Sequence, residues 1–232
     1  MSAATQGHDE NTWFVTKKQS AGKGRLGRDW QSLEGNLTAS LLVQVELEPN
    51  KCAMLGFVAG VALIMALKAF DKEIEAKLKW PNDVLLNGTK LAGILLEMQS
   101  LKNGKQAIVI GFGINVASSP TGLPYAATSL NEHGLDIDCK QLFMALSESF
   151  TKAFEIFMKN EHEIIKQWQQ NGAGLGKEIS IINHGVIING IFEDIDKTGR
   201  LIIKLANGEK QYISAGDMQL GATTNKRENN GE

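Results

Sequence analysis

The sequence is poor in the residues that form disulfides or bind metals. It has two cysteines in 232 residues, and Cys52 and Cys139 lie far apart without CxxC spacing. This predicts buried free thiols in a reducing cytosol. The four histidines occur in unrelated segments without a ligand spacing such as HExxH. We therefore expect no metal site made of protein side chains alone.

A strong net charge and a long apolar run are also absent. The formal net charge of -2 and the pI near 6.1 argue against a general nucleic-acid binder, which is usually basic. Residues 1–12 are polar and show no secretory signal. The most apolar stretch, 53–67, is shorter than the roughly 20 residues of a membrane span. We predict a cytoplasmic protein, with neither DNA nor membrane as partner, that meets any nucleotide with a local cluster of cations.

The composition and the spacing of apolar residues indicate a layered fold. Hydrophobic residues make up 43% and charged residues 22% of the chain, which is typical of a globular protein with a sizeable core. Strands are expected over 12–18, 36–46, 74–80, 84–86, 90–99 and 107–116, and helices over 50–70 and within 139–170. Asn87-Gly88 between two apolar runs is a strong hairpin signal. The pattern predicts an α/β (α+β) domain, with a mostly antiparallel mixed sheet packed against helices.

The glycine-rich stretch 171–176 (NGAGLG) is the clearest domain boundary. We expect one ligand-binding domain over residues 1–172. Turns at short intervals over 177–220 predict a small C-terminal β-barrel, and the polar residues 221–232 predict a disordered tail. The sequence shows no internal repeat and no helix-turn-helix signature.

The most informative stretch runs from Gln19 to Trp30 (QSAGKGRLGRDW). Its glycines allow backbone N–H groups to approach anionic oxygens. Lys23, Arg25 and Arg28 add positive charge suited to phosphate or carboxylate. A solvated flexible loop with incidental cations explains the composition equally well. Neither the Walker phosphate loop nor a convincing dinucleotide-binding fingerprint is present.

Two further motifs follow along the chain. KWPND at 79–83 places Asn82 in a tight turn where two strand ends meet, and KLAGILLE begins with Lys90 and has Gly93 inside a strand. GFGIN at 111–115 ends an apolar strand, where glycines permit a bulge or the wall of a ligand pocket. Each motif also has a structural explanation, since lysines commonly decorate strand ends and a bulge needs no ligand.

In this order and spacing, the three motifs resemble those of biotin–protein ligases, also called biotin–acetyl-CoA-carboxylase ligases. The family pattern is a GRGRxGRxW loop, a KWPNDxxxxxxKxxGxLxE hairpin and a GxGxN strand end. This chain has GKGRLGRDW, KWPNDVLLNGTKLAGILLE and GFGIN. The resemblance covers about residues 7–220 and is to the monofunctional group without an N-terminal DNA-binding domain. It implies a catalytic fold related to class II aminoacyl-tRNA synthetases and lipoate ligases, followed by the small C-terminal barrel.

The resemblance implies an ATP-dependent ligase. Biotin and Mg-ATP give biotinyl-5′-AMP and pyrophosphate, and a lysine of a biotin carboxyl carrier protein, the acetyl-CoA carboxylase subunit, then takes the biotin as an amide. ATP and biotin are thus substrates, and Mg²⁺ accompanies ATP. Lipoate or octanoate transfer is disfavoured because no RRxxGGG-like motif is present. An edge strand of the sheet could pair with a second copy to form a homodimer.

The resemblance also implies roles for the matched residues. Lys90 and Arg25 would be catalytic, with Lys90 stabilising charge that develops in both steps. The residues implied to bind biotin are Gln19, Lys23, Gly24, Arg25, Lys90, Gly93, Gly111 and Gly113. Those implied to bind ATP and the adenylate are Arg25, Arg28, Trp30, Asn82, Lys90 and Asn115. Because the adenylate is not linked to the enzyme, positioning and cationic stabilisation should supply most of the rate.

The chain departs from the family pattern in two places. Lys23 stands where the family usually has Arg, which keeps the charge but loses the planar fork and predicts a weaker grip. The family also has a Ser-Thr-Asn segment ahead of the position of Met1, which helps bind the biotin ureido ring and the adenylate. The alternative hypothesis is therefore a catalytically impaired protein that binds biotin or its adenylate without efficient turnover. An in-frame Ser-Thr-Asn upstream of Met1 would instead favour an ordinary ligase.

Overall fold

The computed structural model describes residues 11–183 and 185–222. A first sheet has six strands, β1 (Thr12–Thr16), β2 (Leu37–Val45), β3 (Ala76–Lys79), β4 (Asp83–Leu86), β5 (Thr89–Ser100) and β6 (Gln106–Ile114). The helices are α2 (Pro49–Ala53), α3 (Leu55–Phe70), α4 (Cys139–Lys159) and α5 (Glu161–Gln170), with the 3-10 turns η1 (Arg25–Gly27) and η2 (Asn131–His133). A second sheet has five strands, β7 (Glu178–Asn183), β8 (Val186–Ile195), β9 (Leu201–Lys204), β10 (Lys210–Ile213) and β11 (Asp217–Leu220).

The first sheet is antiparallel throughout, in the order β1-β2-β6-β5-β4-β3. Alternation along its strands separates a covered face from an open one. On β6, Ile110, Phe112 and Ile114 are buried against helices, whereas Gly111 and Gly113 lie on the opposite face. The register places Gly113 beside Gly93 on β5, so glycines of two neighbouring strands form part of the open face.

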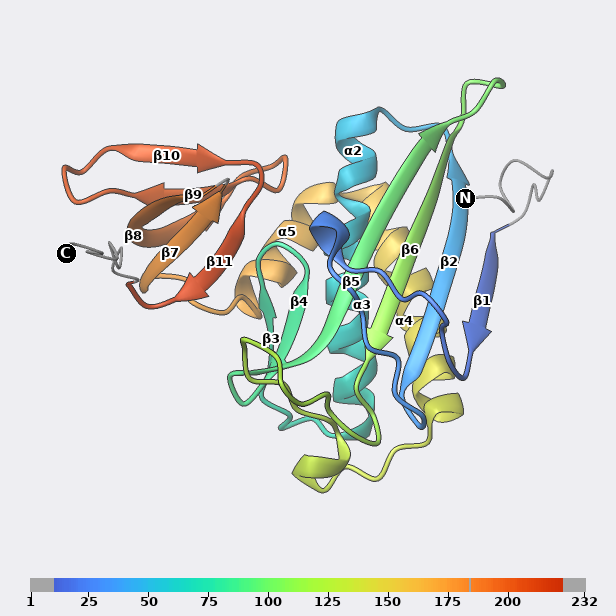
Figure 1. Ribbon diagram of the computed structural model, residues 1–232. Helices are drawn as coiled ribbons and strands as arrows, with labels where there is room; N and C mark the ends of the chain where they lie inside the picture. Colours follow the sequence, from blue (N-terminus) through green and yellow to red (C-terminus); the bar gives the residue numbers. More distant parts are fainter. Residues whose placement is uncertain (1–10, 184, 223–232) are drawn as a thin grey trace, which may run out of the picture.

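Helices cover one face of this sheet and leave the other free for the segment between β1 and β2 (Figure 1). By length and composition alone, residues 49–70 could cross a membrane, since this helical stretch has 22 residues and extends beyond the apolar run 53–67. Most of them are buried, and α3 packs against both α4 and the sheet. An all-round apolar helix of this kind is the core helix of a layered domain.

The second sheet follows the order β10-β9-β8-β7-β11 and curls beside α5 and β3 (Figure 1). The small C-terminal β domain predicted from the sequence is confirmed, although β10 and β11 remain edge strands, so the ladder is not closed into a barrel. Trp80, which is 2% exposed, donates its indole N–H to the Gly199 carbonyl at 3.0 Å. The backbone of Leu78 bonds to Asn171 and Ala173, which fixes the connection between the two sheets.

The predicted elements agree with the structure to within a few residues. The main difference is that 50–70 divides at Met54 into α2 and α3. Local signals, namely turn residues and the spacing of apolar residues, are sufficient here because they indicate where each helix or strand begins and ends. The predictions for residues 1–10 and for the tail at 223–232 lie outside the described residues.

Candidate functional site

The open face of the first sheet forms the floor of a cleft of about 740 Å³. Its walls are the 19–30 loop, the β3–β4 hairpin, residues 124–126 and strand β11 of the second sheet. The predicted site residues that line it are Gln19, Lys23, Gly24, Arg25, Arg28, Trp30, Asn82, Lys90, Gly93, Gly111 and Gly113. The cleft thus brings together three motifs that are far apart in the sequence.

The glycine loop is an ordered turn and not a solvated linker. The N–H of Gly24 donates to the Arg28 carbonyl at 2.7 Å, and the N–H of Trp30 donates to the Gly22 carbonyl at 2.9 Å. Leu26 and Gly27 between them have positive φ, 56° and 73°, which closes the turn. The N–H groups of Gly24 and Trp30 are therefore used within the loop. The loop projects the side chains of Arg25 and Arg28.

Trp30 lies over two of the glycines in the sheet. A Cβ atom on Gly113 would overlap with its indole ring, and one on Gly93 would lie 3.2 Å from Cζ3. A Cβ on Gly111 would be 3.7 Å from its nearest neighbour, the Leu95 carbonyl oxygen. Gly93 and Gly113 thus make room for the indole, while the face of Gly111 remains open.

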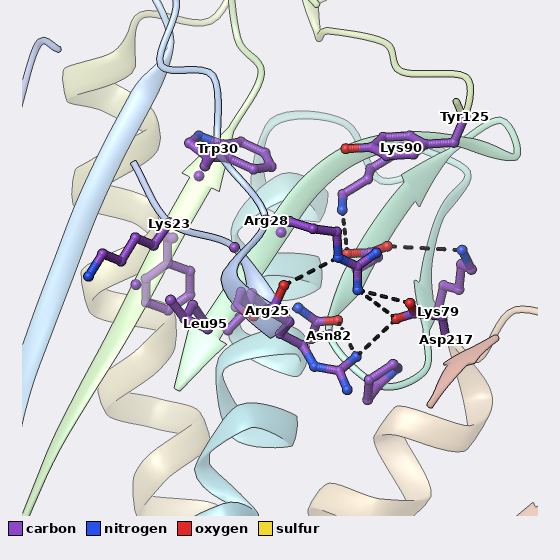
Figure 2. Close-up of a pocket in the computed structure, with 18 of the residues that line it drawn as sticks. Lys23, Arg25, Arg28, Trp30, Lys79, Asn82, Lys90, Leu95, Tyr125 and Asp217 are labelled. Atoms are coloured by element: carbon purple, nitrogen blue, oxygen red, sulfur yellow. Dashed lines mark hydrogen bonds and ion pairs between the residues drawn. The ribbon is translucent and has the colours of Figure 1, made fainter. Parts of the chain in front are cut away.

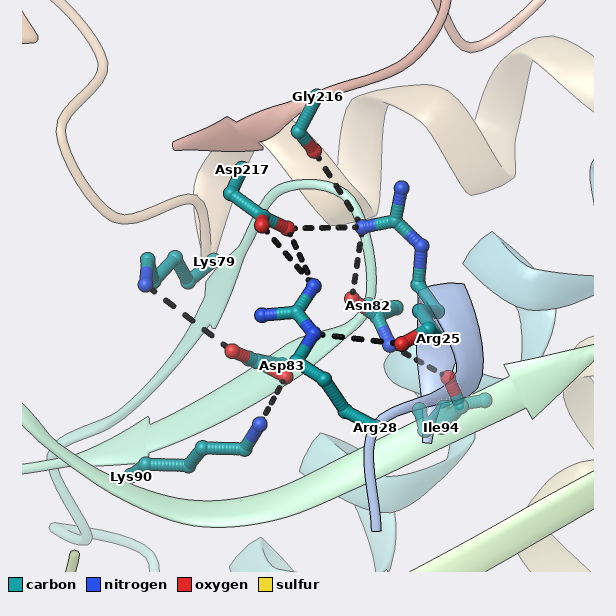
Figure 3. A network of polar contacts seen from close by, with 9 residues as sticks. All are labelled: Arg25, Arg28, Lys79, Asn82, Asp83, Lys90, Ile94, Gly216 and Asp217. Atoms are coloured by element: carbon teal, nitrogen blue, oxygen red, sulfur yellow. Dashed lines mark hydrogen bonds and ion pairs between the residues drawn. The ribbon is translucent and has the colours of Figure 1, made fainter. Parts of the chain in front are cut away.

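Two arginines of the loop meet an acid from the second sheet (Figure 3). Both oxygens of Asp217 accept hydrogen bonds from Arg28 Nη2, at 2.8 and 2.9 Å. Arg25 Nη1 lies 3.6 Å from the same carboxylate and donates to the Gly216 carbonyl at 3.3 Å. Arg25 also donates to Asn82 Oδ1 at 3.4 Å. Burial lowers the pKa of Arg25, and the charge of Asp217 partly offsets this effect.

Lys90 extends into the same cleft, on the side of Arg28 that is farther from Arg25 (Figure 2). Its ammonium forms an ion pair with Asp83 at 2.7 Å. It also lies 5.1 Å from the ring centre of Tyr125 and 5.8 Å from that of Trp30, within the range of cation–π attraction. These contacts hold one cation in a fixed position over the sheet.

Lys79 is a second lysine in this part of the cleft. Its ammonium lies 4.0 Å from Asp83, and 24% of its side chain is exposed. Burial lowers its pKa, although the charge of Asp83 acts in the opposite direction. Lys23, in contrast, is exposed and points away from Arg28 and Asp217 (Figure 2).

Asn115, which the resemblance implies to bind ATP and the adenylate, is not among the residues that line the cleft. Its side chain is 1% exposed and donates to the Thr128 carbonyl at 3.0 Å. It accepts a hydrogen bond from Asn36 at 3.4 Å. Thr128 follows a segment whose backbone pairs with Lys90. Asn115 therefore positions the 117–130 loop beside Lys90.

Sequence reasoning missed several residues of the cleft. Asp83 and Lys79 stand inside the KWPND motif, so the motif itself was the available signal for them. Tyr125 occurs in a loop rich in Ser, Pro and Gly, where the sequence gives no indication of a neighbour. Asp217 belongs to the other sheet, and only the packing of the two sheets places it here.

Comparison with known proteins identifies the family. Residues 5–115 match the model of the biotin/lipoate A/B protein ligase family, and residues 174–221 match that of the biotin protein ligase C terminal domain. The chain is 33% identical over 219 residues to the biotin–acetyl-CoA-carboxylase ligase of Paracoccus denitrificans, which covers 91% of both proteins. The chain belongs to the biotin–protein ligase family.

Two other biotin–protein ligases extend the comparison. The bifunctional ligase/repressor BirA of Bacillus spizizenii is 34% identical over 91% of this chain and 67% of that protein. The structure of the Aquifex aeolicus biotin protein ligase in complex with biotin and ATP aligns with a TM-score of 0.76 and 29% identity, over 91% of this chain and 89% of that one. Because the relatives are named as ligases, the alternative of an impaired binding protein is not favoured.

Proposed function

We propose that this chain forms biotinyl-5′-AMP from biotin and ATP and transfers the biotin to a lysine of a biotin carboxyl carrier protein. The observation that supports this most directly is a single cleft that joins a glycine-floored area of the sheet to a cluster of cations. The open face of Gly111 leaves room for a neutral ring system, and the cations suit phosphates. The names of the Paracoccus and Aquifex relatives support the same substrates.

For biotin we propose the area between the glycine loop and the open face of Gly111. Gln19 and Ser40 supply polar side chains at this end of the cleft, and Lys23 and Gly24 form its rim. Gly93 and Gly113 act indirectly, because they admit the Trp30 indole. Trp30 then separates the biotin end from the nucleotide end and offers a flat face to adenine.

For the adenylate we propose Arg25, Arg28 and Lys90 as the cationic groups. In the first step the biotin carboxylate attacks the α-phosphorus and pyrophosphate leaves. In the second step the acceptor amine attacks the acyl carbon and AMP leaves. Lys90, held by Asp83 at 2.7 Å, stabilises the negative charge that develops in both steps, with Arg25 beside the phosphate. Asn82 positions Arg25 by its hydrogen bond.

We propose that Mg²⁺ enters with ATP and is held chiefly by its phosphates. Two carboxylates face the cation cluster, and both are already paired: Asp83 with Lys90, and Asp217 with Arg28. These two carboxylates could therefore lie beside an ion that the phosphates hold, but they do not form a complete set of protein ligands for it. When bound, the ion neutralises phosphate charge.

The assembly and location are proposed on more general grounds. Residues 171–173 cover the β3 edge of the first sheet, so β1 is the edge that we propose for pairing in a homodimer. A mass of one chain by light scattering would contradict this. The net charge of -2 argues against a general DNA binder, and the two free cysteines fit the reducing cytosol that we propose as the location. We propose residues 1–172 as the catalytic domain and 177–220 as the second domain.

The test of the function is ATP-dependent transfer of biotin to a purified carrier domain. Lys90→Ala removes the cation at the centre of the cleft, and we expect loss of transfer by at least about a hundredfold, the scale of one lost charge-stabilising group. Lys152→Ala is the control, since Lys152 pairs with Glu148 on the exposed side of α4. Unchanged transfer by the Lys90 variant would refute the site assignment. Absence of transfer by the unmodified chain would refute the function.

A further inference from the structure

The second sheet places one carboxylate among the cations of the nucleotide end of the cleft. Asp217 begins β11, and its side chain is 37% exposed. It reaches Arg28 with both oxygens and lies near Arg25. The adjoining Gly216 carbonyl accepts a further hydrogen bond from Arg25. The β domain therefore contacts the glycine loop through two arginines of that loop, Arg25 and Arg28.

The geometry of this contact is that of an arginine holding an oxyanion. A guanidinium binds two oxygens of a carboxylate or of a phosphate with the same planar donors. The Nη2 of Arg28 is occupied by Asp217 at 2.8 Å, and its Nε is occupied by the Arg25 carbonyl at 3.2 Å. A phosphate that reached the same Nη2 would need the position where the Asp217 oxygens lie.

The surrounding charges explain why an anion is present. Arg25, Arg28 and Lys79 converge here, and burial penalises the charged forms of Arg25 and Lys79. Asp217 favours the charged form of both. Without an anion these cations would repel one another across the cleft. Asp217 is thus their counter-ion in the form that the structure describes.

We propose that Asp217 occupies the phosphate position of Arg25 and Arg28 and is displaced when the polyphosphate of ATP binds. The inference rests on the proposed function for its ligand, and it assigns the β domain a part in nucleotide binding. Carboxylate and phosphate compete for the same donors, so each weakens the binding of the other by the same factor. Binding of nucleotide loosens β11 from the glycine loop, and release of pyrophosphate restores the contact.

The test uses inorganic pyrophosphate without magnesium, measured by calorimetry on the full chain. Asp217→Asn keeps the size of the side chain and removes its charge. We expect pyrophosphate to bind about three- to tenfold more tightly to this variant, the scale of one partly exposed ion pair. Glu209→Gln is the matched control, because it removes the same charge from the same β domain. Glu209 bonds to Asn207 in a turn outside the cleft, and its variant should bind pyrophosphate as the unmodified chain does.

Weaker or unchanged pyrophosphate binding by Asp217→Asn would overturn the proposal and make Asp217 a residue that positions the arginines. Absence of pyrophosphate binding by all the proteins would also overturn it. If the variant fails to fold, hydrogen exchange of the unmodified chain decides. Pyrophosphate should then speed the exchange of amides at 216–220, and no change or slower exchange would contradict displacement. Transfer from preformed biotinyl-5′-AMP tests the ligase function separately, since it needs no polyphosphate.

Discussion

Gly111 and Gly113 lie two residues apart on the same face of β6, yet they have different neighbours. The Trp30 indole covers Gly113, while the face of Gly111 is open. The sequence motif GFGIN gives no sign of a difference between these two glycines. Only the position of Trp30, from a loop more than 80 residues earlier in the chain, distinguishes a glycine that admits an aromatic ring from one that borders a pocket.

This difference gives a prediction at the residue scale. In Gly113→Ala the new methyl group forces the indole away from the sheet, and we expect a loss of about 1–3 kcal/mol of stability, as in other overpacked sites. Gly111→Ala meets only ordinary contacts, and its stability should change by less than about 0.5 kcal/mol. Thermal unfolding measures both changes, and the Trp30 indole N–H resonance should move in the first variant alone. Equal shifts in the two variants would contradict the assigned position of Trp30.

Among the predicted site residues, a place in a motif does not by itself determine whether the side chain lines the cleft. Lys90, Arg25 and Arg28 lie in the cleft because each stands in a motif whose local turn determines its direction. Asn115 stands in a motif too, but its amide is used by Asn36 and the Thr128 carbonyl. No local pattern reveals such partners, because they come from segments distant in the sequence.

At the scale of elements, the 117–135 connection is held beside Lys90 by one acid. The Glu132 carboxylate accepts hydrogen bonds from Ser119 at 2.8 Å, Thr128 at 3.0 Å and Ser129 at 3.1 Å. The bond from Ser119 is the main cause of a lowered pKa of Glu132, and those from Thr128 and Ser129 add to it, while burial opposes them. Glu132 thus ties together the two ends of a loop that carries Tyr125.

We expect Glu132→Gln to lower the free energy of unfolding by about 0.5–1 kcal/mol at pH 7. The value is modest because the side chain is exposed to solvent. The pKa of Glu132 is lower in the folded chain than its ordinary 4.5, so the unfolded chain binds the proton first. The contribution of the Glu132 carboxylate to stability is complete above about pH 4.5, and it is lost as the pH falls through the pKa of Glu132 in the folded chain. The stability difference between variant and unmodified chain should therefore shrink below pH 4.5.

Urea unfolding of both proteins at pH 7 and pH 3.5 measures this difference. Glu155→Gln is the control, because Glu155 is exposed on α4 and the described part of the chain gives it no hydrogen bond or ion pair. A difference for Glu132→Gln that grows on acidification would contradict the assigned contacts.

The elements themselves could be predicted because their signals are local. Asn87-Gly88 defines the β4–β5 hairpin, and alternating residues define which face of β6 is covered. The division of 50–70 at Met54 could not be predicted, since Met54 is a good helix former. How the curled β domain meets the first sheet also depends on contacts between distant residues.

At the scale of the whole molecule, the two sheets share one apolar core. Phe192 of β8 contacts Trp168 of α5, and Trp168 contacts Phe57 of α3, with ring centres 6.4 and 5.4 Å apart. Buried residues of both sheets belong to one cluster. The domain boundary in the sequence therefore does not separate two independent cores, and we expect one cooperative unfolding transition.

Trp80 provides the test of this coupling, since its indole N–H bonds to Gly199 of the β domain at 3.0 Å. Trp80→Phe keeps a ring but leaves the Gly199 carbonyl without this donor and a gap beside it, which should cost about 1–3 kcal/mol. Because the core is shared, calorimetry should show one transition at a lower Tm. Tyr212→Phe changes one exposed polar atom of β10 and should leave the Tm within about one degree. A separate, early transition of the β domain in the Trp80 variant would show that the two sheets unfold independently.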